Sequence, residues 1–231
     1  MKFFKSVESK ISVERVSLLL FAASICFICF YIFNYGFTNQ FNSDSATANL
    51  LAEDQVITKS FFPHTWYYYQ DIWITAINNY IVLINGFVND ELLSRSIAVL
   101  IQTLILAVVT YQLVFKIFNS RVSAFISLAI IFSGISNLFI DMYFGQAAYA
   151  NITICIMVSL YISLLLLDDK VYSKARMAIL FCLFSLMLII LNMSGLRYAF
   201  IFTIPLVASI ILYGFLDNIK KPSFNKKILL C

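Results

Sequence analysis

The stretch VSLLLFAASICFICFYIFNYGF, residues 16–37, carries no charged side chain. A helix needs roughly 20 consecutive apolar residues to cross a bilayer, so this stretch is long enough to span one. Basic residues precede it, as in a signal peptide. It is nevertheless longer than the roughly 7–15 apolar residues of such a leader, and no small-residue cleavage site follows it. We therefore predict a first transmembrane span that is retained in the protein.

The rest of the chain repeats this pattern. Five more apolar stretches are candidate spans, at 93–115, 122–140, 147–167, 176–194 and 197–216. Of the 231 residues, 61% are hydrophobic and 12% are charged, and the mean hydropathy is +0.89, whereas soluble proteins carry about 25% charged residues. This composition excludes a water-soluble domain. It predicts a single all-α transmembrane domain over 1–231, a polytopic helical bundle of about six spans.

The charge distribution orients the predicted spans. With six spans and a cytosolic N-terminus, 13 of the 16 Lys and Arg residues lie on the cytosolic side, in keeping with the positive-inside rule. Counting the shorter apolar run 72–88 as a span would reverse this bias, so we expect it to lie along the outer membrane surface. Because the basic residues form short clusters between apolar runs, they indicate anchoring in a plasma or inner membrane rather than nucleic-acid binding.

Residues 38–91 form the large extracytoplasmic loop of this topology. We expect a first loop helix from residue 43 or 44 to about 58 and, after Pro63, a second one that starts near Asp71. Trp66 lies in a cluster of tryptophan and tyrosine residues, whose rings are apolar and whose tips are polar. Such side chains favour the headgroup level of a bilayer, which predicts that the loop helices lie on the membrane surface.

Two acidic residues are candidates for chemistry. A carboxylate at Asp44, just after the first span, can act as a general base on a hydroxyl or bind a metal. Its alternative role is to cap the helix that follows, because Asp is favoured at that position. Asp141 is the only acid in FIDMYFGQ, 139–146, the predicted outer turn between spans three and four. Charged groups at such depth are often functional, and the alternative is a solvated turn residue.

Four further residues are candidates for binding substrate. Arg95 and Arg197 lie near the outer ends of predicted spans, where each can bind a lipid phosphate or extend its charge to the headgroups. His64 and Trp66 can bind a sugar, and the alternative is that this cluster anchors the loop at the interface. Because His64 is the only histidine, a His-rich metal site is excluded.

The order of these features resembles the polytopic GT-C glycosyltransferases that use polyprenyl-phosphate-linked sugars, such as the protein O-mannosyltransferases and the aminoarabinose transferases. Members have one span, then a long outer loop with an acidic residue near its start, and a second acidic position in the turn between spans three and four. NSDSA around Asp44 and IDMY around Asp141 match these positions. The segment 60–71 resembles the middle of that loop, and LRYAF around Arg197 is similar to an Arg-Tyr segment of bacterial members.

The resemblance implies an inverting transfer of a sugar from a polyprenyl-phosphate donor to an acceptor hydroxyl on the extracytoplasmic face. It implies that Asp44 is the base. It also implies that Arg95, Arg197 or a divalent metal near Asp141 stabilises the leaving phosphate. Many members have two acids in the second turn, whereas Asp141 stands alone here. The resemblance therefore does not decide whether this chain binds a metal.

The resemblance covers only the N-terminal half of a usual member. After a basic segment at 220–227, the last residues read ILLC, which is typical of the start of a further span. We therefore expect a truncated chain. A multi-pass transporter or flippase and a non-catalytic assembly partner are the alternative functions. Transporters usually show internal repeats and polar residues near mid-bilayer, whereas this sequence has no repeat and its charges lie at predicted helix ends.

Overall fold

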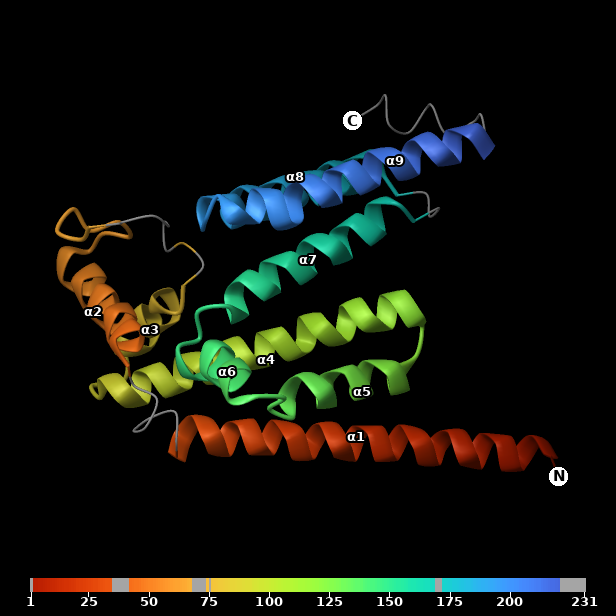
Figure 1. Ribbon diagram of the computed structural model, residues 1–231, viewed down its shortest axis with the longest axis horizontal. Helices are drawn as coiled ribbons and strands as arrows, with labels where there is room; N and C mark the ends of the chain where they lie inside the picture. Colours follow the sequence, from red (N-terminus) through yellow and green to blue (C-terminus); the bar gives the residue numbers. More distant parts are fainter. Residues whose placement is uncertain (1, 35–41, 68–73, 75, 169–171, 221–231) are drawn as a thin grey trace. The chain divides into compact units, whose positions relative to one another are not determined.

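The computed structural model describes residues 2–34, 42–67, 74, 76–168 and 172–220 of the chain (Figure 1). Every regular element in these ranges is a helix, so the prediction of an all-α protein is confirmed. The chain divides into two compact units. The first comprises Met1–Tyr67 with Thr75–Met157, and the second comprises Tyr68–Ile74 with Val158–Cys231. Each unit is described by itself below.

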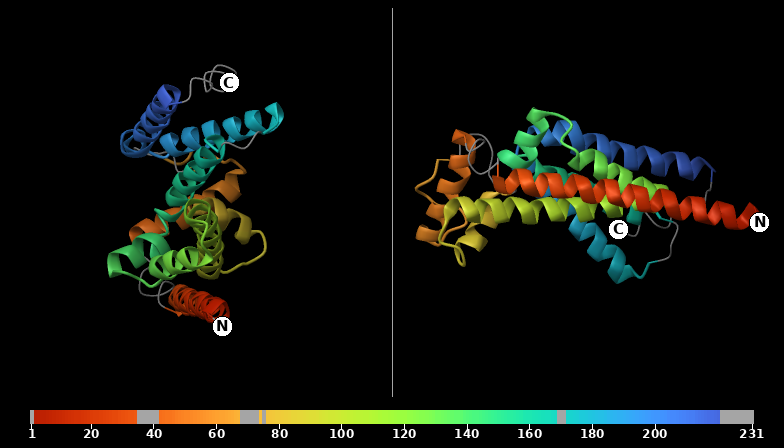
Figure 2. Two further views of the ribbon diagram at one scale, coloured as in Figure 1. Left: turned by 90° about the vertical axis from the view of Figure 1, so that its right-hand side faces the viewer. Right: turned by 90° about the horizontal axis from the view of Figure 1, so that it is seen from below.

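The first unit is built on three helices: α1 (Lys2–Asn34), α4 (Glu91–Phe118) and the shorter α5 (Arg121–Phe132). They run alongside one another, with α1 and α5 in the same direction and α4 antiparallel to both (Figure 1 and Figure 2). Aromatic rings fill the interface between α1 and α5. The Phe21 ring lies 6.2 Å from that of Phe125 and 6.2 Å from that of the fully buried Phe132. Apolar packing of this kind joins the two helices along their shared length.

Residue types explain the tight turn between α4 and α5. Asn119 ends α4 in the left-handed conformation, with φ +48°, and its N–H donates to the carbonyl of Phe115 at 2.8 Å. Asn tolerates this conformation better than most residues. The next residue, Ser120, caps α5 by accepting a hydrogen bond at 3.2 Å from the N–H of Ser123. Two residues are therefore enough to reverse the chain.

The predicted third span, 122–140, is not a single straight helix. The segments Arg121–Phe132 and Asn137–Gly145 are bent by 95° relative to one another. The second segment consists of α6 (Asn137–Ile140) and the π-helix η1 (Asp141–Gly145). Gly134 lies in the bend with φ +71°, and a Cβ there would lie 2.8 Å from Ile140 Cδ1. Only glycine adopts this backbone conformation in so little space.

Four of the described helices are long and apolar enough to cross a membrane: Val13–Asn34, Glu91–Phe118, Lys174–Met193 and Ala199–Leu216. The bent pair is a fifth candidate if it counts as one span. The predicted fourth span corresponds to α7 (Ala150–Leu166), which has 17 residues and falls short of the usual roughly 20. The chain thus has several apolar helices suited to a membrane, and the number six stays a prediction.

The loop after α1 contains α2 (Ser43–Thr58), and these bounds match the expectation from the sequence. The cap of α2 is Asn42, whose side chain accepts a hydrogen bond at 3.0 Å from the N–H of Ser45. The second described loop helix, α3 (Asn78–Asn85), begins later than the predicted start near Asp71, which itself lies outside the described residues. A buried hydrogen bond of 2.9 Å from Asn78 Nδ2 to Gln55 Oε1 joins α3 to α2.

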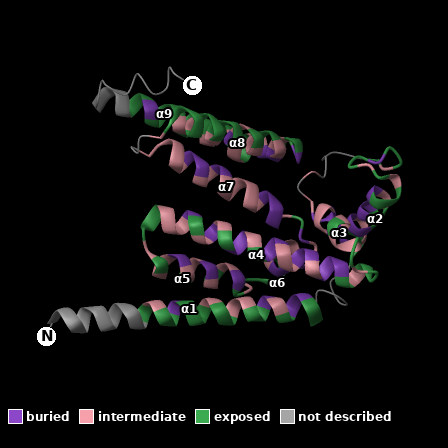
Figure 3. Cartoon of the chain, turned by 180° about the vertical axis from the view of Figure 1, so that it is seen from behind, coloured by how far each residue is buried: buried purple, intermediate pink, exposed green. Residues whose placement is uncertain are grey.

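The second unit contains α8 (Lys174–Met193), the π-helix η2 (Ala199–Thr203) and α9 (Ile204–Lys220). Ser173 caps α8 through a hydrogen bond of 3.3 Å from the N–H of Arg176. Thr203 Oγ1 donates to Asn192 Oδ1 at 3.1 Å, which joins η2 to the end of α8. Many residues of α8 and of the part of α9 up to residue 216 are exposed (Figure 3), and they include large apolar side chains such as those of Phe181, Ile211 and Phe215. Such a surface suits contact with lipid.

Candidate functional site

Arg95 is the centre of the candidate site. It lies in the first turns of α4, where Asp90 caps the helix, and only 5% of its surface is exposed. Nη1 donates to Ser45 O and to Asn49 Oδ1, both at 3.1 Å. Nη2 donates to Gly145 O and to Gln146 O, both at 2.9 Å. One guanidinium thus binds α2 on one side and the end of η1 on the other.

All four acceptors of Arg95 are neutral oxygens. Within the described ranges, the structure gives its guanidinium no carboxylate partner within 4.0 Å. A buried charge without a counter-ion is costly unless hydrogen bonds satisfy it, and the four bonds supply that compensation. The charged end of the side chain is buried within the protein in this conformation. The predicted binding of a lipid phosphate would have to add to these contacts or replace some of them.

Asp141 begins the π-helix and is half-buried, rather than a solvated turn residue. Its Oδ2 accepts a hydrogen bond of 2.7 Å from Gln146 Nε2, and its carbonyl accepts one of 2.7 Å from the Gln146 N–H. Oδ1 is buried and has no hydrogen-bond partner among the described residues. The carboxylate therefore keeps one oxygen available inside the fold.

The segment between η1 and α7 is held from α4 as well. Ala147 is completely buried and has φ +56°, which is unusual for alanine. Its carbonyl accepts a hydrogen bond of 3.3 Å from Nε2 of the fully buried Gln102. Non-helical backbone at membrane depth is tolerated where the protein satisfies its polar groups. Arg95 and Gln102 do so for three consecutive carbonyls, at residues 145–147.

Asp44 is exposed in the first turn of α2. Because Asn42 caps this helix, the alternative role of Asp44 as the cap is wrong. Its carboxylate has no hydrogen-bond partner among the described residues and is accessible to other groups. The next residue is Ser45, whose carbonyl binds Arg95. Arg95 thus contacts the chain directly after Asp44 and also Gln146, the residue that binds Asp141.

The other predicted site residues lie elsewhere. His64 is exposed and Trp66 half-buried in the segment that follows α2, which folds back on that helix through a hydrogen bond of 2.6 Å from Thr65 Oγ1 to Asp54 Oδ2. The contacts described within 42–67 do not connect His64 or Trp66 to Asp44. Arg197 belongs to the second unit, is exposed, and has its guanidinium carbon 5.1 Å from the centre of the Tyr198 ring.

Sequence reasoning missed three residues of this site, Asn49, Gln102 and Gln146. A signal for Gln102 was present. Inside the apolar run of α4, three buried polar residues share a face with Arg95, because they follow it at intervals of 7, 8 and 15 positions: Gln102, Thr103 and Thr110. Polar residues within an apolar span usually face the protein interior and mark function. No comparable pattern identifies Asn49 or Gln146 from the sequence.

Asp141 is the residue of this site that could bind a metal. Among the described residues, no group of three or more His, Cys, Asp or Glu side chains could hold a metal ion. The unpartnered Oδ1 of Asp141 fits one ligand position. Mg²⁺ is often bound by one or two carboxylates, with phosphate oxygens and water as its other ligands. The chain can therefore contribute to a metal site here, but the other ligands would have to come from a substrate and water.

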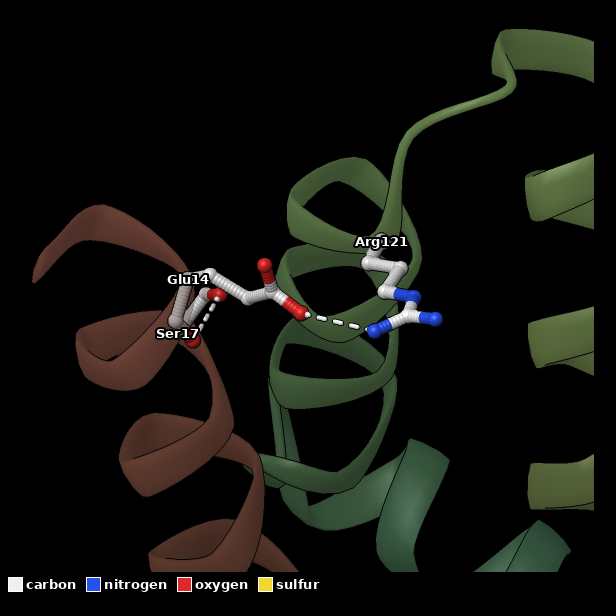
Figure 4. Close-up of polar contacts among 3 residues, drawn as sticks. All are labelled: Glu14, Ser17 and Arg121. Atoms are coloured by element: carbon white, nitrogen blue, oxygen red, sulfur yellow. Dashed lines mark hydrogen bonds and ion pairs between the residues drawn. The ribbon is translucent and has the colours of Figure 1, made fainter. Parts of the chain in front are cut away.

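A pocket at the other end of α4 has a different character. It has a volume of about 510 Å³ and is lined by residues of α1, α4 and α5, among them Glu14, Asn119 and Arg121. Glu14 Oε1 lies 3.5 Å from Arg121 Nη1, and Ser17 Oγ donates to the Glu14 carbonyl at 2.8 Å (Figure 4). The two charges compensate each other, so this pocket is a weaker candidate than the region around Arg95.

The chain matches no protein-family model, no curated protein and no solved structure in the three comparisons.

Proposed function

We propose that the chain is a membrane glycosyltransferase of the GT-C type, which moves a sugar from a polyprenyl-phosphate donor to an acceptor hydroxyl on the extracytoplasmic face. The observation that carries this proposal is the set of contacts made by Arg95. They join the backbone next to Asp44 to the residue that binds Asp141. The two acidic positions of the family resemblance thus belong to connected parts of one unit.

The proposed reaction assigns a different task to each residue. Asp44, exposed and not engaged in capping, accepts the proton of the acceptor hydroxyl as its oxygen attacks the anomeric carbon. The bond to the donor phosphate breaks in the same step, and negative charge develops on the phosphate. Arg95, Arg197 or a divalent metal near Asp141 stabilises that phosphate. A divalent metal bound at Asp141 would add positive charge there.

The proposed topology follows the basic clusters of the sequence. The N-terminus is cytosolic, and α2, α3 and the segment 60–67 lie at the outer surface of the plasma or inner membrane, where His64 and Trp66 contact substrate or headgroups. The exposed aromatic side chains in and beside this region, Phe61, Phe62, Tyr67 and Phe87, support an interfacial position. The donor reaches the site from the bilayer, because its hydrocarbon tail stays in lipid.

The test is Asp44→Asn in a sugar-transfer assay with purified chain in liposomes that contain a polyprenyl-phosphate sugar. Loss of a general base lowers turnover by about 10²- to 10⁴-fold. The matched control is Glu53→Gln, which changes another exposed acid of α2. Transfer that persists in Asp44→Asn would overturn the mechanism. Absence of transfer by the unaltered chain over a panel of donors would overturn the function.

A multi-pass transporter is the second candidate, and the broken helix carrying Asp141 favours it. Transporters build substrate sites on discontinuous helices whose unwound backbone is buried in protein. The 95° bend, the π-helix and the segment 145–147 fit that description. Uptake of a labelled sugar or lipid into vesicles that depends on Asp141 but not on Asp44 would favour this function over glycosyl transfer.

A further inference from the structure

Two polar residues of α4 hold the unwound backbone that follows η1. Arg95 and Gln102 are seven positions apart, which is close to two helical turns and places them on one face of α4. Together they donate to the carbonyls of residues 145, 146 and 147. The same face of α4 therefore binds the backbone at the point where the chain leaves the π-helix and turns toward α7.

Arg95 also fixes α2. Among the described residues, both hydrogen bonds between α2 and α4 come from its guanidinium, one to Ser45 O and one to Asn49 Oδ1. The planar guanidinium can donate to acceptors on two sides at fixed angles, which a lysine ammonium cannot reproduce. Two segments that are about 100 residues apart in sequence are thereby connected through one side chain.

We infer that Arg95 and Gln102 form a polar clamp that sets the position of α2 relative to the η1–α7 segment, and that Arg95 is a positioning residue for both acidic residues. Asp44 directly precedes the clamped Ser45, and Asp141 is bonded to the clamped Gln146. Loss of the guanidinium removes four hydrogen bonds at once, and the carbonyls of residues 145 and 146 lose the donor that they have in this structure. The two segments then separate or rearrange so that those carbonyls find new partners.

The test measures the distance between two spin labels in the full chain, reconstituted in lipid nanodiscs. The five native cysteines are first replaced by serine, and labels are attached through Glu53→Cys on α2 and Ala148→Cys beside η1, both exposed positions. A second pair, Leu20→Cys and Ile126→Cys, reports the α1–α5 packing. Distances are then compared with and without Arg95→Met.

The clamp predicts that Arg95→Met broadens and lengthens the 53–148 distance distribution while the 20–126 distribution keeps its width. Arg121→Met, which removes an exposed arginine of the same unit, leaves both distributions unchanged. An unchanged 53–148 distribution in Arg95→Met would overturn the inference.

If Arg95→Met broadens both distributions, the same two distances are measured in Gln102→Met, which is a milder change. This variant keeps all four bonds of Arg95 and removes only the bond to Ala147. A broader 53–148 distribution with an intact 20–126 distribution supports the clamp, and no change in either one overturns it.

The consequence for catalysis rests on the proposed function. In the sugar-transfer assay, displaced reacting groups lower kcat by about 10²-fold, with a smaller change in KM for the donor. Arg95→Lys separates positioning from charge, because it keeps the charge and loses the two-sided geometry. A kcat like that of the unaltered chain would overturn the positioning role. If the label distances respond as predicted but the unaltered chain transfers no sugar, the clamp stands and the proposed function fails.

Discussion

Gln146 donates its side-chain amide to Asp141 Oδ2 at 2.7 Å, and its own carbonyl accepts from Arg95 at 2.9 Å. Gln146 therefore connects the acidic residue of the broken helix to the cation of α4. The amide of Gln146 is neutral and brings no charge of its own beside the carboxylate of Asp141. A second carboxylate at this position would repel the charge of Asp141.

Gln146→Glu tests this arrangement. We expect a loss of about 1–3 kcal/mol in stability at neutral pH, because a donor is removed and two carboxylates then lie side by side. Thermal unfolding in detergent at neutral pH measures this, with the exposed Asn137→Asp as control. Equal stability of Gln146→Glu and the unaltered chain at neutral pH would contradict the prediction.

Gly134 and Gly86 form a matched pair for backbone strain. Gly134→Ala forces φ +71° on alanine and places its Cβ 2.8 Å from Ile140 Cδ1, so we expect a loss of about 1–2 kcal/mol or more. Gly86 has φ −65°, and its Cβ would meet only Leu83 O at 3.5 Å. Gly86→Ala should be neutral or stabilise by about 0.4–1 kcal/mol. Thermal unfolding measures the stability of both variants. Equal changes in stability would contradict the left-handed backbone conformation of Gly134.

Asn42→Ala tests which residue caps α2. Removing this side chain should cost about 1 kcal/mol and raise amide hydrogen exchange in the first turn of the helix. Asp44→Asn should leave that exchange nearly unchanged, because the carboxylate of Asp44 accepts no capping bond. If Asp44→Asn accelerated exchange as much as Asn42→Ala, the capping assignment would be wrong.

The ion pair of Glu14 and Arg121 should contribute little. The side chains are 40% and 66% exposed, and exposed pairs are typically worth about 0–1 kcal/mol. Arg121→Met should therefore change the unfolding midpoint only slightly and reduce its dependence on salt. A large loss of stability would mean that Arg121 makes contacts beyond Glu14. It would also remove this variant as the control for Arg95→Met.

The sequence predicts that this chain is helical, but apolar runs do not show where a helix breaks or bends. The all-α class and the bounds of α2 follow from apolar runs and turn residues. The break at 133–136 was not predicted, because counting apolar side chains over 122–140 says nothing of the φ value at Gly134. Arg95 was identified, but not its partners. Three of its four acceptors are main-chain carbonyls, which every residue possesses and no sequence pattern marks.

The long-range bonds of Arg95 also set an order for assembly during synthesis. Its acceptors lie about 50 residues before it and about 50 after it. When α4 leaves the ribosome, α2 has already been made, but the carbonyls of residues 145 and 146 do not yet exist. At about 5–20 residues per second, they follow several seconds later. During that interval the guanidinium can reach at most two of its four final acceptors, Ser45 O and Asn49 Oδ1.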